Sequence, residues 1–296
     1  MKKCTFLSVA FLFLCTISFA SFGEVSSKEK KVLLDLYHST HGEKWNQSWN
    51  IDSPVSSWKG IEIKDSHIVG INLFHNNLSG SLPESIGELE KLERLNLAFN
   101  SITGVLPKDI VKLKCLKILK LEMNRIKGNL PEGIGNLHNL EEFSMFNNFL
   151  NGPIPKSFGD ISTLKILNLS SNNLKGIIPG SLGNLKNLQT LGLFENALEG
   201  EIPKEMGNLK KLEELVLANN KLGGEIPKEL DQLASLKVLQ IQNNRIKSFK
   251  GLQNMKSKSL LVFDTDEKKY NSLYDDSAIK KSRMADTKFE DDDDNK

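Results

Sequence analysis

The sequence contains little cysteine, and that cysteine cannot crosslink the fold. Of the three cysteines in 296 residues, Cys4 and Cys15 lie within a stretch that has the composition of a cleaved leader. Cys115 is then left with no partner, so the mature chain can form no internal disulfide. The fold must therefore be stabilised by noncovalent packing.

The sequence also lacks the short motifs that mark many enzymes. It contains no Gly-x-Ser-x-Gly, His-Glu-x-x-His, P-loop or Gly-x-Gly-x-x-Gly pattern. His38 and His41 are close together in the chain, but no third zinc ligand accompanies them. We therefore predict a protein that is not an enzyme and that uses no cofactor and no metal.

Strong charge of either sign is missing. Thirty-nine basic residues against 37 acidic ones leave a net charge of +2. Nucleic-acid binding needs a concentrated positive field, so we predict no nucleic-acid partner. The one dense charge run, residues 290–294, is acidic and is typical of a solvated tail.

Long apolar runs are limited to the beginning of the chain. Residues 6–17 are apolar, follow Lys2 and Lys3, and precede Ser18-Phe19-Ala20, a small-x-small cleavage pattern. A membrane-spanning helix needs about 20 apolar residues, so this run is short for one. We predict a signal peptide over residues 1–20, no transmembrane span, and a mature protein that is secreted or lies at the cell surface or in the periplasm.

The sequence does contain one phrase that recurs at a fixed distance. Residues 92–100 are LERLNLAFN, and related segments follow every 24 residues up to 236–244, with one earlier copy at 68–76. Leu95 and Leu97 alternate with polar or small residues, which predicts a strand with one buried face. A single strand of this kind cannot bury its apolar side, so neighbouring copies must stack into a solenoid.

Each copy ends in an asparagine and continues into a turn. Because an asparagine side chain both donates and accepts, we predict a buried ladder of amides that serves the turn backbone. A glycine and a proline follow, such as Gly104 and Pro107. Because proline cannot donate, we expect no regular sheet on this side of the coil. The predicted ladder consists of Asn76, Asn100, Asn124, Asn148, Asn172, Asn196, Asn220 and Asn244.

These motifs resemble the plant-type leucine-rich repeat. The pattern LxxLxLxxNxLxGxIPxxLGxLxx is followed almost letter for letter over residues 188–211. The resemblance implies an α/β repeat solenoid, a superhelix whose parallel β-sheet lines the concave face. Plant members carry a cysteine pair before the repeats. Ser56 and Ile63 stand there in this chain, which looks more like the disulfide-free secreted members of bacteria and protists.

Both ends of the array need a cap, because the first and last coils expose an open core. Ser26 and Glu29 form a capping-box pattern that begins a helix, and all three tryptophans follow before the first repeat. The predicted organisation is a helical, tryptophan-rich cap at 21–67, eight repeats at 68–250, a short cap with one closing strand at 251–264, and a polar, acidic tail at 265–296.

The repeat pattern fixes the leucines and the asparagine of each copy but not the exposed residues between and just after the leucines. These exposed positions include aromatic residues among charged ones, which is typical of binding faces, so we expect the function there. We predict a monomer whose concave face binds a protein, peptide or glycan. A structural or adhesive surface protein, or an inhibitor of a secreted hydrolase, is the alternative. The candidate contact residues are Phe74, His75, Arg94, Phe99, Lys120, Glu122, Met123, Phe146, Phe149, Phe194 and Glu195.

Overall fold

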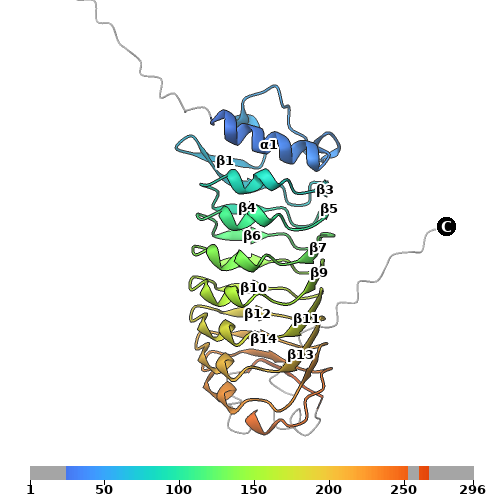
Figure 1. The fold of residues 1–296 in the computed structure, drawn as a ribbon, viewed down its shortest axis with the longest axis vertical. Coiled ribbons are helices and arrows are strands. Elements are labelled where there is room, and N and C mark those ends of the chain that lie inside the picture. The colour runs from blue at the N-terminus through green and yellow to red at the C-terminus, as the bar shows by residue number, and fades with distance from the viewer. Residues whose placement is uncertain (1–24, 253–259, 267–296) are drawn as a thin grey trace, which may run out of the picture.

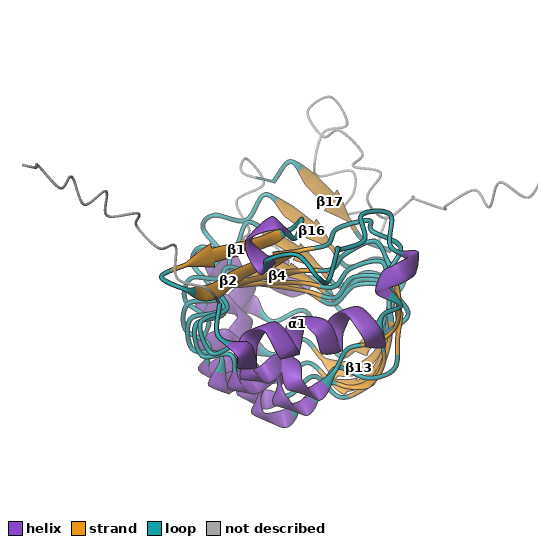
Figure 2. Cartoon of the chain, turned by 90° about the horizontal axis from the view of Figure 1, so that it is seen from above, coloured by secondary structure: helices purple, strands orange, loops and turns teal. Residues whose placement is uncertain are grey.

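The computed structural model describes residues 25–252 and 260–266, and it shows a column of stacked coils (Figure 1). Seen from the N-terminal end, each coil has three sides: one large sheet, a second sheet, and a row of short helices (Figure 2). The predicted signal peptide and most of the predicted tail lie outside the described residues. The predicted fold class, an α/β solenoid of leucine-rich repeats, is confirmed.

The large sheet has ten strands, ordered β1-β2-β4-β6-β8-β10-β12-β14-β16-β17. From β2 onward all pairs are parallel, and the register advances by 24 residues, as in Leu95 opposite Leu119. We call its outward surface the concave face. The strands are β1 (Ile61–Lys64), β2 (His67–Asn72), β4 (Arg94–Asn96), β6 (Ile118–Lys120), β8 (Glu142–Ser144), β10 (Ile166–Asn168), β12 (Thr190–Gly192), β14 (Glu214–Val216), β16 (Val238–Gln240) and β17 (Val262–Asp264).

The core runs without interruption through the coils. Leu95, Leu119 and Leu167, inward strand residues of three different coils, are each 0% exposed and belong to one hydrophobic cluster. Burying one leucine side chain contributes about 1.5–3 kcal/mol, and each coil contributes several. The array is therefore stabilised by contacts between neighbouring coils and not by any coil alone.

The asparagine side chains join each coil to the preceding one. Asn148 is 5% exposed, and its Nδ2 donates to the carbonyl oxygens of Leu121 (2.9 Å) and Met145 (3.2 Å). Its Oδ1 accepts from the backbone N–H of Ile126 at 3.0 Å. Asn100, Asn124, Asn172, Asn196, Asn220 and Asn244 donate in the same way to their own coil and to the one before.

The second side of the coil does form a regular sheet, so the expectation of none was wrong. Five parallel strands follow the order β15-β13-β11-β9-β7, and a separate pair joins β3 to β5. The strands end before the proline, as β13 ends two residues before Pro203, so the missing N–H does not interrupt the ladder. They are β3 (Ser79–Ser81), β5 (Ser101–Thr103), β7 (Lys127–Asn129), β9 (Phe149–Gly152), β11 (Asn173–Ile177), β13 (Ala197–Glu201) and β15 (Lys221–Gly223).

A row of short 3-10 helices forms the third side and returns the chain to the next strand. Ile86 lies in the first of these helices and Leu89 directly follows it, and both are 0% exposed. Gly87 packs so closely on the next coil that a Cβ there would lie 2.3 Å from the backbone oxygen of Asp109. The helices are η3 (Glu84–Glu88), η4 (Lys108–Lys112), η5 (Glu132–Asn136), η6 (Lys156–Asp160), η7 (Gly180–Asn184), η8 (Lys204–Asn208) and η9 (Lys228–Gln232).

The N-terminal cap covers the open end of the first coil. Helix α1 (Ser27–Ser39) begins at the N-cap Ser26, whose Oγ accepts from the backbone N–H of Glu29 at 3.2 Å. The chain continues through η1 (Gly42–Lys44), which directly precedes Trp45, and η2 (Val55–Ser57), which directly precedes Trp58. The three tryptophans pack together. Trp49 lies 4.8 Å from both Trp45 and Trp58 between ring centroids, and all three are buried. Every indole N–H donates to a backbone oxygen.

Strand β1 adds an antiparallel strand that the sequence analysis did not foresee. It pairs with β2 through a two-residue turn at Asp65 and Ser66, both with positive φ. This conformation suits the twist of a tight hairpin. The hairpin covers the N-terminal edge of the large sheet, and β17, after η10 (Lys250–Leu252), pairs with β16 near the other end.

Candidate functional site

The structure places the candidate contact residues in two groups and one outlier. Arg94 and Lys120 are strand residues of β4 and β6. Most of the others lie in the turns that directly follow the strands, next to the ladder asparagines. These turn residues are Phe74, His75, Phe99, Glu122, Met123, Phe146, Phe194 and Glu195.

Phe149 is the outlier, and its assignment to the concave face needs correction. It is the first residue of β9 and pairs with Lys127 of β7, so it belongs to the second sheet. Its ring is 55% exposed there. The error arises because Phe149 follows Asn148, where the chain has already turned the corner from one sheet to the other.

One turn position in each coil holds a left-handed backbone. Phe99 and Met123 have φ of 58° and 53°, and Glu195 has 52°. Asparagine tolerates this conformation and occupies the same place in three other coils, but most side chains adopt it at a cost of about 1–2 kcal/mol. The backbone N–H groups of Phe99, Met123 and Glu195 donate to carbonyl oxygens of the next coil, which holds this backbone conformation in place.

Two exposed aromatic rings lie together at the N-terminal end of the concave face. Phe74 and Phe99 are 52% and 45% exposed, and their ring centroids are 5.2 Å apart. His75 lies 6.2 Å from Phe74. Exposed rings that touch one another form a larger apolar surface than isolated ones, and such clusters anchor protein partners.

Beside these rings the concave face has a depression of about 260 Å³. Its lining includes Gly70, which stands opposite Arg94 of the next coil, and the side chain of Glu62 packs over that glycine, where a Cβ would lie 2.7 Å from Glu62 Oε2. Two ion pairs lie in its lining: Arg94 pairs with Glu62 of β1, and Lys120 pairs with Glu142 at 2.9 Å. The remaining lining residues are Gly60, Ile71, Asn72, Asn96 and Ile118.

The electrostatics keep both cations of this depression charged. The hydrogen bond to Glu62 raises the pKa of Arg94, and the hydrogen bond to Glu142 raises the pKa of Lys120. Nearby, burial raises the pKa of the Glu122 carboxyl above its usual value, and a hydrogen bond with Ser144 opposes this only in part. Its Oε2 is buried with no hydrogen-bond partner.

Four polar residues of the depression, Glu62, Asn72, Asn96 and Glu142, were not among the candidate contact residues. Glu62 lies in the hairpin before the repeats, and no periodic pattern connects it to Arg94. Asn72 and Asn96 occupy the free strand position between the two leucines, which could have been found by listing that position in every coil. The pairing of Glu142 with Lys120 joins neighbouring strands diagonally and needs the register to be known.

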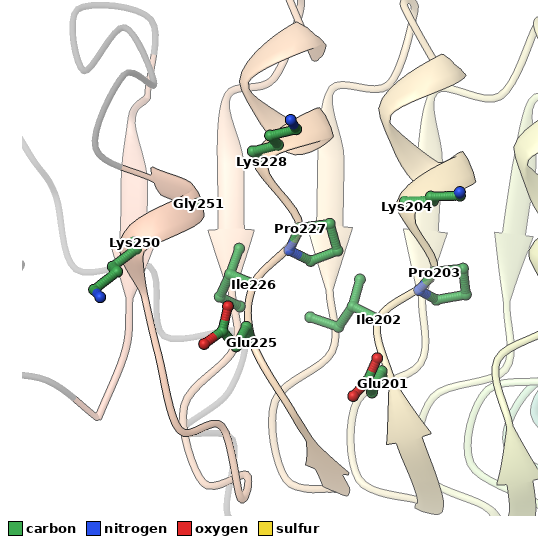
Figure 3. Close-up of a pocket in the computed structure, with 10 residues that line it drawn as sticks. All are labelled: Glu201, Ile202, Pro203, Lys204, Glu225, Ile226, Pro227, Lys228, Lys250 and Gly251. Carbon is green, nitrogen blue, oxygen red and sulfur yellow. The ribbon is translucent and has the colours of Figure 1, made fainter.

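A larger hollow of about 660 Å³ lies elsewhere, in the loops between the second sheet and η8 and η9 (Figure 3). It is lined by the repeated Glu-Ile-Pro-Lys segments 201–204 and 225–228 and by Lys250 and Gly251. Figure 3 shows the two glutamates at one side and Lys204 and Lys228 at the other. It lies where the eighth coil departs from the repeat, and no candidate contact residue lines it.

Comparison with known families assigns this architecture. A leucine-rich repeat region model matches residues 71–153, a leucine-rich repeat model matches 138–198, and a two-copy leucine-rich repeat model matches 210–254. The chain belongs to the leucine-rich repeat family, and its plant-type repeats fit the plant receptor ectodomains among its structural neighbours.

Several solved structures resemble this chain. The ectodomain of the Arabidopsis thaliana receptor kinase GASSHO1/SCHENGEN3, in complex with CASPARIAN STRIP INTEGRITY FACTOR 2, is 30% identical with a TM-score of 0.75, over 79% of this chain and 29% of that one. Arabidopsis HAESA, in complex with the peptide hormone IDA and a co-receptor, is 42% identical with a TM-score of 0.58, over 60% and 29%. A Leptospira interrogans leucine-rich repeat protein is 35% identical with a TM-score of 0.54, over 64% and 47%. This chain thus spans less than half of each.

Two features are absent from the part of the chain that the structure describes: a membrane-spanning helix and a metal-binding cluster. Within residues 25–252 and 260–266, no helix is long and apolar enough to cross a bilayer. The same part of the chain contains no cluster of three or more histidine, cysteine, aspartate or glutamate side chains arranged to hold a metal ion.

Proposed function

We propose that this protein is an exported recognition module that binds a protein or peptide through the concave face of its large sheet. The observation that carries the proposal is the row of non-identical side chains on an otherwise uniform frame. Inward positions are mostly leucine, whereas the outward strand positions and the turns that follow them change from coil to coil and include Phe74, Phe99, Phe146 and Phe194.

The structural comparisons support a protein or peptide as the class of ligand. The GASSHO1/SCHENGEN3 ectodomain and the HAESA structure are complexes with a named factor and a peptide hormone. An extended peptide advances about 3.4 Å per residue and neighbouring strands lie about 4.8 Å apart, so about three ligand residues span two coils and a short peptide can contact several coils of the sheet.

The test is capture of a partner from the extracellular fluid in which the protein occurs, followed by substitution. Replacing both Phe146 and Phe194 by serine should abolish capture and leave the thermal midpoint nearly unchanged, because both side chains are partly exposed. Phe149→Ser is the control, since this ring is more exposed than those of Phe146 and Phe194 but belongs to the second sheet.

The proposal fails if capture survives the double substitution, or if Phe149→Ser alone removes it. Self-association that persists in all these variants would instead support the adhesive alternative, in which the repeats provide spacing and lateral contacts.

A further inference from the structure

We propose that the outward face of the second sheet binds a polyuronate, a linear polysaccharide whose sugar units each carry one carboxylate. This goes beyond the proposed function, because it uses a different sheet from the concave face. The proposal concerns the third, fourth and fifth coils, whose strands in the second sheet are β7, β9 and β11 (Figure 1). Three features of these coils support it: a row of free amides, cations on both sides of that row, and exposed apolar side chains beside the cations.

Three exposed asparagines lie side by side across these strands. The strand register places Asn129 opposite Asn151, and Asn151 opposite Asn173. Within the described residues, their side-chain amides form no hydrogen bond. Each amide both donates and accepts, and neighbouring strands lie about 4.8 Å apart. The face therefore offers a free donor and acceptor at each step of that length, and we call these three residues the amide row.

Basic side chains flank the amide row on both sides. Lys127 lies two residues before Asn129 on β7, and Lys175 lies two residues after Asn173 on β11. Each lysine is thus on the same face of the sheet and about 7 Å from the row. Both side chains are exposed, and neither forms an ion pair in residues 25–252 and 260–266. Both cations are therefore available to an anionic ligand.

The charge on this part of the second sheet is of one sign. The outward residues of the three coils are the first, third and fifth after each ladder asparagine, and all nine are exposed. They comprise three basic residues, three asparagines, three apolar residues and no acid. Acidic residues on this sheet begin with Glu199 of β13, opposite Ile177. On the concave face, by contrast, Arg94 and Lys120 already pair with glutamates. Charge complementarity therefore favours an anionic ligand on the second sheet.

Apolar side chains accompany the two lysines. Phe149 is 55% exposed and lies directly opposite Lys127 in the register. Pro153 is exposed on the other side of the amide row, two residues after Asn151. The face of an aromatic ring is electronegative and attracts weakly positive C–H groups, such as those on the flat side of a sugar ring. Phe149 can therefore stack on a sugar whose hydroxyls reach the amide row.

A linear polysaccharide laid along the amide row meets these groups together. Sugar hydroxyls both donate and accept, as the asparagine amides do. In a 1,4-linked chain, one pyranose unit extends by nearly the strand spacing of about 4.8 Å. Successive units present their carboxylates on opposite sides of such a chain, and Lys127 and Lys175 lie on opposite sides of the row. A polyuronate thus matches the hydrogen-bonding groups, the charge and the spacing.

An acidic peptide fits the same face less well. A peptide advances about 3.4 Å per residue, so its residues fall out of step with amides about 4.8 Å apart. Peptides gain main-chain hydrogen bonds by adding to a free strand edge, but β9 and β11 are each paired on both sides. Peptide N–H and C=O groups pressed against this face would therefore mostly lose water without gaining a partner.

Isothermal titration calorimetry of the full chain tests the proposal with three probes of equal length. They are a 1,4-linked mannuronate hexamer, the neutral mannose hexamer with the same linkage, and hexaglutamate. We expect the mannuronate hexamer to bind, and its affinity to fall with added salt because the contacting charges are exposed. The mannose hexamer and hexaglutamate should each bind at least about ten-fold more weakly.

Substitutions then locate the binding surface. Lys127→Gln, Asn151→Ala and Phe149→Ser should each weaken binding of the mannuronate hexamer at least about three-fold. Lys221→Gln is the matched control, because it removes the same charge from an exposed residue of the same sheet. Lys221 lies on β15 opposite Glu199, outside the three coils, so binding should be unchanged. All four variants should keep the thermal midpoint of the unmodified chain, since the replaced side chains are exposed.

The proposal is overturned if the mannuronate hexamer does not bind, or if the mannose hexamer binds as tightly. Equal binding of hexaglutamate would assign the face to acidic peptides instead. An effect of Lys221→Gln as large as that of Lys127→Gln would show a response to net charge alone. Failure here is distinguishable from failure of the proposed function, because the two surfaces have separate variants. Replacing Phe146 and Phe194 by serine should leave mannuronate binding intact, and its loss in that variant would also overturn the proposal.

Discussion

Replacing Asn148 by alanine tests how the coils are joined. Asn148 is 5% exposed and lies in the middle of the array. Its loss removes three donated hydrogen bonds and one accepted bond. The carbonyl oxygens of Leu121 and Met145 each keep a second amide donor, from Asn124 and Asn172. The backbone N–H of Ile126, by contrast, loses the only acceptor that the structure gives it.

The expected cost follows from that single orphaned group. Leaving one buried backbone donor unsatisfied costs about 1–3 kcal/mol. Asn148→Asp should cost more, because an aspartate keeps the acceptor but places a buried charge against carbonyl oxygens that it cannot satisfy. Asn139→Ala is the control, because the side chain of Asn139 is exposed and makes one hydrogen bond, to the oxygen of Lys114 at 2.7 Å.

Urea unfolding measures the effect, followed by far-UV circular dichroism and by tryptophan fluorescence. All tryptophans lie in the N-terminal cap, so fluorescence reports on the cap and dichroism on the whole array. We expect Asn148→Ala to lower the free energy of unfolding by about 1–3 kcal/mol by dichroism. If Asn148→Ala behaves like Asn139→Ala, or if Asn148→Asp is as stable as the unmodified chain, the ladder does not hold the coils together.

Two further substitutions test the packing and the electrostatics. Gly183→Ala should destabilise the array by about 1–3 kcal/mol, because its Cβ would lie 2.4 Å from the backbone oxygen of Glu205 in the next coil. Gly133→Ala has its nearest neighbour at 3.4 Å and should be nearly neutral in the same urea unfolding experiment. Glu122→Gln should raise the melting temperature at about pH 7 and lose this advantage at about pH 3. The reason is that burial raises the pKa of Glu122, so the folded state holds this proton more tightly than the unfolded chain, and stability falls as pH rises from the unfolded pKa through the folded one. A melting temperature for Glu122→Gln below that of the unmodified chain at neutral pH would contradict this account.

The fold was largely predictable because its determinants are periodic. The 24-residue spacing of Leu95 and its equivalents specifies both the strand and its neighbour, and the structure shows them opposite one another. The second sheet was missed because the proline of each coil was taken to forbid pairing. The strands there end before the proline, so the residue that lacks an N–H lies outside the paired segment.

The candidate site was less predictable because it depends on departures from the period. Arg94 and Lys120 could be named from their strand positions, but Glu62 lies on β1 outside the repeats. Gly70 leaves room for the side chain of Glu62 by lacking a Cβ, and the sequence shows it only as one more glycine. The prediction for Phe149 was wrong because this residue directly follows Asn148 in the turn and is already the first residue of β9 in the second sheet.

Blocking one sheet at a time tests the central claim most directly. In a Cys115→Ser background, Asn168→Cys and Lys175→Cys each carry a bulky polyethylene glycol maleimide, the first on β10 of the large sheet and the second on β11 of the second sheet. We predict that the adduct at position 168 abolishes partner capture and that the adduct at position 175 does not. Undiminished capture with the adduct at 168, or its loss only with the adduct at 175, would contradict binding through the concave face.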